Sequence, residues 1–243
     1  MRAAAAALAL IMAGCAAAPP PTLAVRDASI LTADRIAGDE RAPFRSIFCA
    51  TLAETTPEAA PCDAYLWRDP TEPPAVPPSD SLAPLRADWR VVMVSGYASD
   101  CVSPWFRMFG DARARLIELG VDVVDAPVAG LSGTRWNAAI LADTLRQLDG
   151  APERRTLLIG YSKGAADILE MLGTDPAAAA RVDAVVSISG ALGGAQLVAT
   201  APEMLDALVD HAPGTACEPH DGHALYALRP DVRAVRLATN PPP

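Results

Sequence analysis

The sequence is poor in the residues that usually build metal sites. It contains three histidines, and its five cysteines form no Cys-x-x-Cys pair or Cys/His cluster, so we expect no metal and no other cofactor. It also lacks an excess of basic residues: the formal net charge is −9, which argues against nucleic acid as a partner. No internal repeat is evident. With 51% hydrophobic residues, the 243-residue chain can form one fair-sized domain or two small ones.

The N-terminus carries an apolar run that is too short to span a bilayer. Residues 3–13 follow Met1-Arg2 and lead into Met12-Ala13-Gly14-Cys15, which predicts a signal peptide over residues 1–15. Its end resembles a bacterial lipobox, with Met12 where leucine is usual. The resemblance implies a lipid on Cys15 that anchors the chain to the bacterial cell envelope. The alternative is plain secretion, after cleavage near residues 16–18. Both alternatives predict export.

Export gives the remaining cysteines a structural interpretation. If Cys15 carries lipid, four cysteines remain, which is an even number in an oxidising compartment, where disulfides form. We favour the pairs Cys49–Cys62, which closes a short local loop, and Cys101–Cys217, which would tie two loops at the same edge of the core. Spacing alone leaves the other two pairings open.

Residues 16–89 read as an N-terminal extension. A short helix is expected over Arg45–Ala53. The segment Asp69–Pro84 is rich in proline among acidic and small residues, which is typical of an irregular or extended linker. The core is therefore expected to begin at Arg90.

From Arg90 onward, apolar strands alternate with amphipathic helices, which predicts right-handed βαβ units and an α/β fold with a mostly parallel sheet. The expected strands are Val91–Val94, Val121–Val128, Thr156–Gly160 and Val182–Ile188, and all but the second are expected to be buried. The expected helices are Pro104–Leu119, Thr134–Leu148, 163–172 with Gly173 as its cap, a short one at Asp175-Pro176, and Pro230–Ala238.

One strand-to-helix junction carries a chemical signature. Gly160-Tyr161-Ser162-Lys163-Gly164 has the pattern G-x-S-x-G between an expected strand and an expected helix, which is the setting of a nucleophile elbow. A sharp turn strains the serine backbone and presents its hydroxyl at the helix N-terminus. Glycines on both sides let neighbouring backbone pack closely. Ser162 is the candidate catalytic nucleophile; the alternative is an ordinary glycine-rich turn.

Residues 90–190 resemble the α/β-hydrolase superfamily, on its lipase, esterase and thioesterase side. Gly160–Gly164 carries the resemblance, and the strand and turn at Val91–Gly96 support it. The resemblance implies a three-layer sandwich and a Ser-His-Asp/Glu triad that hydrolyses an ester or thioester through an acyl-enzyme. The substrate does not follow from the fold.

The same resemblance implies an oxyanion hole made of two backbone N–H groups. We expect one donor from Lys163, the residue after the nucleophile, and the other from Tyr97 or Ala98, after the first core strand. The side chain of Lys163 is expected to point into solvent, away from the serine.

The sequence departs from the family beyond residue 190. The fold orders its triad as serine, acid, histidine, with the last two after later strands, but only one clear strand follows Ser162. Residues 191–243 read as a cap or lid, with a further helix over Pro202–His211, and the sheet lacks its last strands. His211, His220 and His223 all lie in this region. We therefore expect the acid and the base beyond residue 243, with a loop histidine as the less favoured base.

The sequence thus predicts an exported serine hydrolase that acts on a small-molecule or lipid acyl substrate. Two alternatives remain open. A hydrolase-like lipoprotein without catalysis would bind a lipid, glycan or protein partner. An acyltransferase would use the same site and would differ in the access of water.

Overall fold

A computed structural model describes residues 41–74, 88–102, 109–148, 154–200, 217 and 220–243. The chain divides into two compact units, residues 1–80 and 81–243, which we treat separately. The predicted signal peptide with Cys15 lies outside the described residues, as do the helix expected over Pro202–His211 and that histidine. Within the described ranges, no helix has both the length and the apolar character needed to cross a membrane.

The smaller unit is built around helix α2 (Arg41–Thr55), which contains the predicted helix. A short 3-10 helix, η3 (Cys62–Ala64), follows, and the Cys49–Cys62 disulfide joins the two with a Cα–Cα distance of 5.4 Å. The buried side chain of Arg45 donates to Glu72 at 2.6 Å and to the carbonyl oxygen of Leu66 at 3.0 Å. One buried arginine and one disulfide therefore fasten the loop after α2 to the helix.

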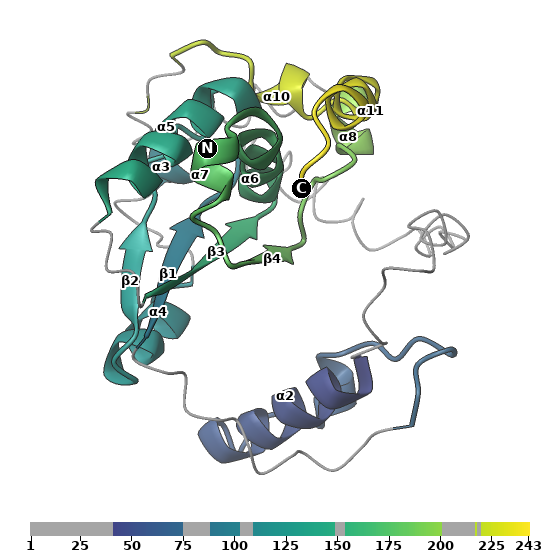
Figure 1. The fold of residues 1–243 in the computed structure, drawn as a ribbon. Helices are drawn as coiled ribbons and strands as arrows, with labels where there is room; N and C mark the ends of the chain where they lie inside the picture. Colours follow the sequence, from purple (N-terminus) through teal and green to yellow (C-terminus); the bar gives the residue numbers. More distant parts are fainter. Residues whose placement is uncertain (1–40, 75–87, 103–108, 149–153, 201–216, 218–219) are drawn as a thin grey trace, which may run out of the picture. The chain divides into compact units, whose positions relative to one another are not determined.

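The larger unit contains a parallel sheet in the order β2-β1-β3-β4 (Figure 1). Its strands are β1 (Trp89–Val94), β2 (Asp122–Asp125), β3 (Arg155–Tyr161) and β4 (Ala184–Ile188). β1 pairs with β2 and β3 on either side, and β3 pairs with β4, all in parallel. The predicted α/β fold with a mostly parallel sheet is confirmed.

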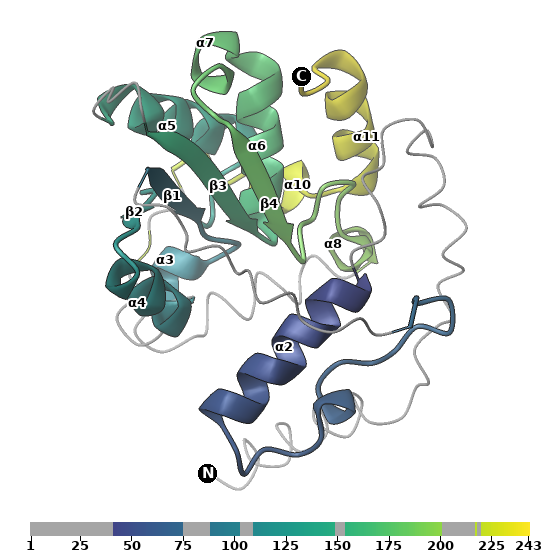
Figure 2. The ribbon, with the colours of Figure 1, turned by 60° about the horizontal axis from the view of Figure 1, so that its bottom comes forward.

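Helices cover both faces of the sheet (Figures 1 and 2). Helices α5 (Thr134–Gln147), α6 (Lys163–Thr174) and α7 (Pro176–Ala179) lie on one face, and α4 (Gly110–Glu118) lies on the other. Because neighbouring residues of a strand point to opposite faces, Val92 and Leu158 join the core under α5 and α6, while Val91 and Met93 join the core under α4. The remaining helices are α3 (Ser99–Val102), α8 (Gln196–Thr200), α10 (Ala224–Ala227) and α11 (Pro230–Thr239).

Several details differ from the sequence prediction. The helix expected over Pro104–Leu119 does not run through Phe109, whose φ of 57° makes it the N-cap of α4. The strand expected over Val121–Val128 is shorter and ends at Asp125. Gly173 does not cap α6 but lies inside it, where a Cβ atom would come within 2.2 Å of the carbonyl oxygen of Asn240. Its lack of a side chain lets the end of α11 approach α6. Strand β4 is not buried: Val185 and Val186 are 39% and 41% exposed. The reason is its position at the sheet edge, where it pairs with β3 alone among the described strands.

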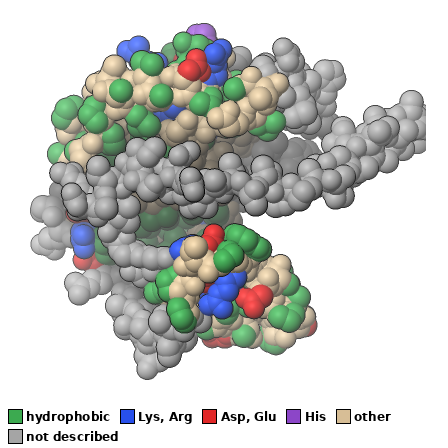
Figure 3. Space-filling model, turned by 90° about the vertical axis from the view of Figure 1, so that its right-hand side faces the viewer, with side chains coloured by type: hydrophobic (Ala, Val, Ile, Leu, Met, Phe, Trp, Pro, Cys, Tyr) green, Lys and Arg blue, Asp and Glu red, His purple; other side chains and the backbone are tan. Residues whose placement is uncertain are grey.

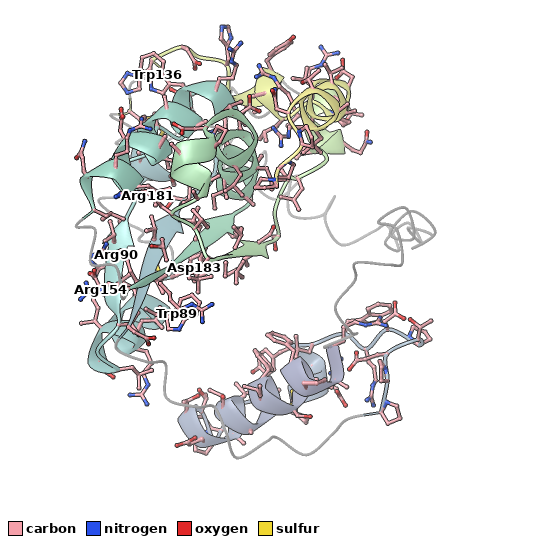
Figure 4. The ribbon with its side chains drawn as sticks, viewed as in Figure 1. Trp89, Arg90, Trp136, Arg154, Arg181 and Asp183 are labelled. Carbon is pink, nitrogen blue, oxygen red and sulfur yellow. A yellow bond between two sulfur atoms is a disulfide. The ribbon has the colours of Figure 1, made fainter. Side chains whose placement is uncertain are left out.

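Charged side chains join the strands at the end of the sheet opposite the elbow. The Asp122 carboxylate accepts from Arg90 at 2.6 Å and from Arg154 at 2.8 Å, and the two arginines lie close together in Figure 4. Arg155 stacks over the Trp89 ring, 4.2 Å from its centroid. These contacts fix where β1, β2 and β3 begin.

Candidate active site

Ser162 lies between β3 and α6 in a strained backbone conformation. Its φ is 51° and its ψ is −118°, a region that residues with a side chain rarely adopt and that costs on the order of 1–3 kcal/mol. The Ser162 N–H donates to the carbonyl oxygen of Ile188 at the end of β4 (3.0 Å), and its carbonyl oxygen accepts from Ala191 (3.0 Å). Hydrogen bonds with Ile188 and Ala191 therefore hold the sharp turn that the G-x-S-x-G pattern predicted.

The glycines of the motif are required by close packing. A Cβ atom on Gly164 would lie 2.2 Å from the carbonyl oxygen of Val94, and one on Gly160 would lie 2.6 Å from the Cα atom of Ala165. Gly96, at the turn after β1, would place a Cβ atom 3.1 Å from the Cβ atom of Ser162. The turn after β1 thus lies directly against the serine.

Gly164→Ala is expected to destabilise the larger unit by about 3 kcal/mol, because backbone atoms cannot move aside for the new methyl group. Gly110→Ala is the matched control, since it also places alanine in the first turn of a helix but meets no atom within 4 Å. Chemical denaturation of both variants measures the difference. Equal stability of the two variants would contradict the close packing of the elbow.

The two segments expected to supply the oxyanion donors lie on either side of the serine. Lys163 is the first residue of α6, so its N–H has no partner within the helix. Ala98, two residues after Gly96, has a φ of 54°. Gly130 packs against this turn, because a Cβ atom there would come within 2.6 Å of the Ala98 nitrogen. The turn at residues 96–98 and the first residue of α6, Lys163, thus both lie next to Ser162.

The side chain of Lys163 does not point into solvent, contrary to the sequence prediction. The only lysine of the chain is 0% exposed, and its Nζ atom lies 2.9 Å from Oδ2 of Asp167, which is also 0% exposed. The i,i+4 spacing puts both side chains on one face of α6. Asp167 also contacts Asn137 of α5, so the ammonium group is buried beside a carboxylate between the two helices.

The Asp167 carboxylate extends this ion pair to helix α5. Asn137 Nδ2 donates to Asp167 Oδ2 at 2.8 Å, and the Asn137 amide also exchanges two hydrogen bonds of 3.0 Å with the backbone of Ala129. Burial raises the pKa of Asp167 to about 6, against the opposing effect of the Lys163 charge. Because Gly130 follows Ala129, the buried network connects the two segments on either side of Ser162.

A second buried ion pair joins α6 to α11. Glu170 accepts from Arg233 and from Arg236, and Arg233 also donates to the carbonyl oxygen of Leu192 at 3.1 Å. Burial lowers the pKa of Arg233, and the Glu170 charge opposes that shift. Helix α11, which the sequence predicted but could not place, is thereby fixed against α6.

The described histidines do not contact the serine. The ring of His220 stacks on Trp136, with centroids 5.3 Å apart, and that of His223 lies 6.3 Å from the Tyr226 ring. Trp136 is visible on α5 in Figure 4. Among the described residues, no hydrogen bond joins Ser162 Oγ to an imidazole. Neither described histidine therefore occupies the position of a catalytic base.

The Cys101–Cys217 disulfide forms as the spacing favoured, with a Cα–Cα distance of 4.7 Å. It ties α3, directly after the Gly96 turn, to a segment distant in the sequence. In the described part of the chain these sulfurs and Asp100 are the one group with metal-ligand geometry, and sulfurs joined in a disulfide cannot act as thiolate ligands.

Comparison with known proteins gives structural but no family-level matches. No protein-family model and no curated protein sequence matches the chain. A metagenomic carboxyl esterase, MGS0156, superposes with a TM-score of 0.71 at 32% identity over 82% of this chain. The lipase BlEst2 of Bacillus licheniformis, in its mature form, superposes with a TM-score of 0.52 at 22% identity over 68% of this chain. The chain spans 61% and 64% of these two proteins, and the likeness shows the fold.

Proposed function

We propose that the chain is the nucleophile-bearing part of a serine hydrolase that cleaves esters or thioesters of a lipid-like acyl group. The observation that carries the proposal is the strained backbone of Ser162, held between β3 and α6 with Gly96 against it. Strain of this kind persists where the surrounding structure enforces it, and it is commonest at functional sites. The likeness to a carboxyl esterase at 32% identity supports the same reaction class.

In the proposed reaction, Ser162 Oγ attacks the acyl carbon while a base takes the hydroxyl proton. Negative charge then develops on the carbonyl oxygen, and the N–H groups of Lys163 and of Tyr97 stabilise it. Collapse of this intermediate expels the alcohol or thiol, which takes a proton from the protonated base and leaves an acyl-enzyme. Water then attacks the acyl-enzyme, releases the acid and restores the serine.

We assign the base and its acid partner to segments outside the described residues. The described histidines are engaged elsewhere, with Trp136 and Tyr226. We further propose that the protein is exported and lipid-anchored through Cys15. Two disulfides in a chain of this size are consistent with an oxidising compartment.

The competing function is a hydrolase-like binding protein without catalysis. It is favoured by one observation: no described imidazole contacts Ser162. Such a protein has no need of a strained serine with the Gly96 turn packed against it, so this combination argues for the enzyme.

Turnover of p-nitrophenyl butyrate tests the proposal. We expect the chain to release p-nitrophenol above the buffer rate, with a burst that approaches one equivalent if deacylation is the slower step. Gly110→Ala serves as a variant control that keeps the rate. A folded chain that releases p-nitrophenol only at the buffer rate would contradict hydrolysis by these residues and favour the binding protein.

A further inference from the structure

A cavity of about 390 Å³ lies where α5 begins and the segment before α10 passes over it. Its wall includes Thr134 and Arg135 from α5, Asp221 and His223 from the loop, Tyr226 from α10 and Arg236 from α11. Ser162 is not part of the wall. Basic side chains, a histidine and an acidic side chain lie along the upper edge of the larger unit in the space-filling view (Figure 3).

Within the described part of the chain, the first turn of α5 leaves the N–H groups of residues 134–136 without acceptors. Its N-cap residue is Gly133, which has no side chain to accept from the helix, and the turn carries no acidic residue. The first bond within the helix is from Asn137 to Gly133, so the N–H groups of residues 134–136 lack intrahelical acceptors. This is the positive end of the helix dipole, which favours an anion.

Thr134 provides independent evidence for a ligand. Its side chain is 1% exposed, and among the described residues its Oγ1 atom has no hydrogen-bond partner. A buried hydroxyl without a partner is uncommon and costs about 1–3 kcal/mol. A ligand oxygen in the cavity would satisfy this hydroxyl and the open N–H groups together.

The charges of the wall select an anion. Arg135 is exposed and makes no ion pair with any described residue, and its place in the first turn opposes the helix dipole unless an anion lies nearby. The Asp221 carboxylate is already used, since Oδ1 accepts from the N–H groups of Gly133 (2.8 Å) and His223 (3.2 Å). Asp221 therefore holds the loop over the cavity, and no described backbone carbonyl accepts from the N–H groups of residues 134–136.

We propose that this cavity binds an organic monocarboxylate with a short apolar body. The carboxylate accepts from the first turn of α5, the Thr134 hydroxyl and the Arg135 guanidinium, while the apolar body lies against Tyr226 and Ala227. The cavity volume exceeds that of an inorganic oxyanion, which favours the organic ligand. This binding is separate from hydrolysis and does not require Ser162 to be reactive.

Isothermal titration calorimetry with hexanoate tests the site, with 1-hexanol as the neutral probe and inorganic phosphate as the bare oxyanion. We expect hexanoate to bind at one site and more tightly than either comparison probe. Thr134→Val is expected to weaken hexanoate about fivefold without loss of folding, because it removes a hydroxyl that has no protein partner. Arg135→Gln is expected to weaken it about tenfold.

Arg115→Gln is the matched control, because Arg115 is an exposed helical arginine away from the cavity, and it should leave hexanoate affinity unchanged. The proposal is overturned if hexanoate does not bind, if hexanol or phosphate binds as tightly, or if Arg115→Gln weakens hexanoate as much as Arg135→Gln. The same titrations on Ser162→Ala should give the wild-type affinity, which separates this site from the proposed active site.

Discussion

Replacing Ser162 with alanine is expected to lower ester turnover by on the order of 10⁴-fold or more. In the proposed reaction, the hydroxyl oxygen of Ser162 forms the acyl-enzyme. Its loss removes the covalent route and leaves only the contributions of the oxyanion donors and of substrate binding. Alanine keeps the Cβ atom of the serine and should leave the fold intact. The measurement is kcat/KM for p-nitrophenyl butyrate, with circular dichroism to verify folding.

Ser189 offers a matched control for this substitution. It also follows a parallel strand, β4, and has a positive φ of 48°, close to the 51° of Ser162. Ser189→Ala removes a hydroxyl from another serine with a positive φ and should keep kcat/KM within about twofold. Retained turnover in Ser162→Ala, or an equal loss in Ser189→Ala, would contradict the assignment of Ser162.

Lys163→Met is expected to destabilise the larger unit by about 3–5 kcal/mol, because it leaves the buried Asp167 carboxylate without its cation. Asn137 still donates to that carboxylate, but an amide does not neutralise its charge. The free energy of unfolding from denaturant titration gives the size of the loss. Arg115→Met, at an exposed ion pair, is the control and should cost less than about 1 kcal/mol.

The pH dependence of this loss identifies its cause. In the wild-type fold the pKa of Asp167 is already raised to about 6, and removal of Lys163 raises it further. A raised carboxyl pKa contributes stability below the pKa of the unfolded chain, and that contribution is lost as the pH rises through the folded pKa. The deficit of Lys163→Met should therefore be larger at pH 8 than at pH 5.

A double variant separates the buried charge from lost packing. Lys163→Met with Asp167→Leu removes both charges and should recover most of the stability, because an apolar pair of similar volume avoids the cost of desolvation. A loss that is independent of pH and is not recovered in the double variant would show that packing, rather than the unpaired carboxylate, is responsible.

The elements around the elbow could be predicted because local signals and burial agree there. Val91–Val94 and Thr156–Gly160 are apolar runs that end in glycine-containing turns, and both form central strands of the sheet. The G-x-S-x-G pattern predicted the sharp turn because a residue with a side chain at position 164 would clash with the backbone of Val94. Both disulfide pairs were favoured by the same reasoning about loops and export.

The long-range features could not be predicted from local patterns. The sequence predicts that the side chain of Lys163, directly after Ser162, points into solvent. Only the packing of α5 on α6 shows that it is buried with Asp167 and Asn137. The apolar sequence of β4 predicts burial, whereas the order of the strands leaves Val185 and Val186 half exposed. The signal for the buried network was the spacing of Lys163 and Asp167, which lie four residues apart on one helix face.

Labelling with a fluorophosphonate probe tests the central claim most directly, because the probe phosphonylates serines that are activated for acyl chemistry. We expect one adduct per folded chain, mapped by peptide mass spectrometry to the peptide that contains Ser162 and absent from Ser162→Ala. Labelling of Ser189→Ala should match the wild type. A folded chain that stays unlabelled, or that is labelled at another residue, would contradict the proposal that Ser162 is a nucleophile.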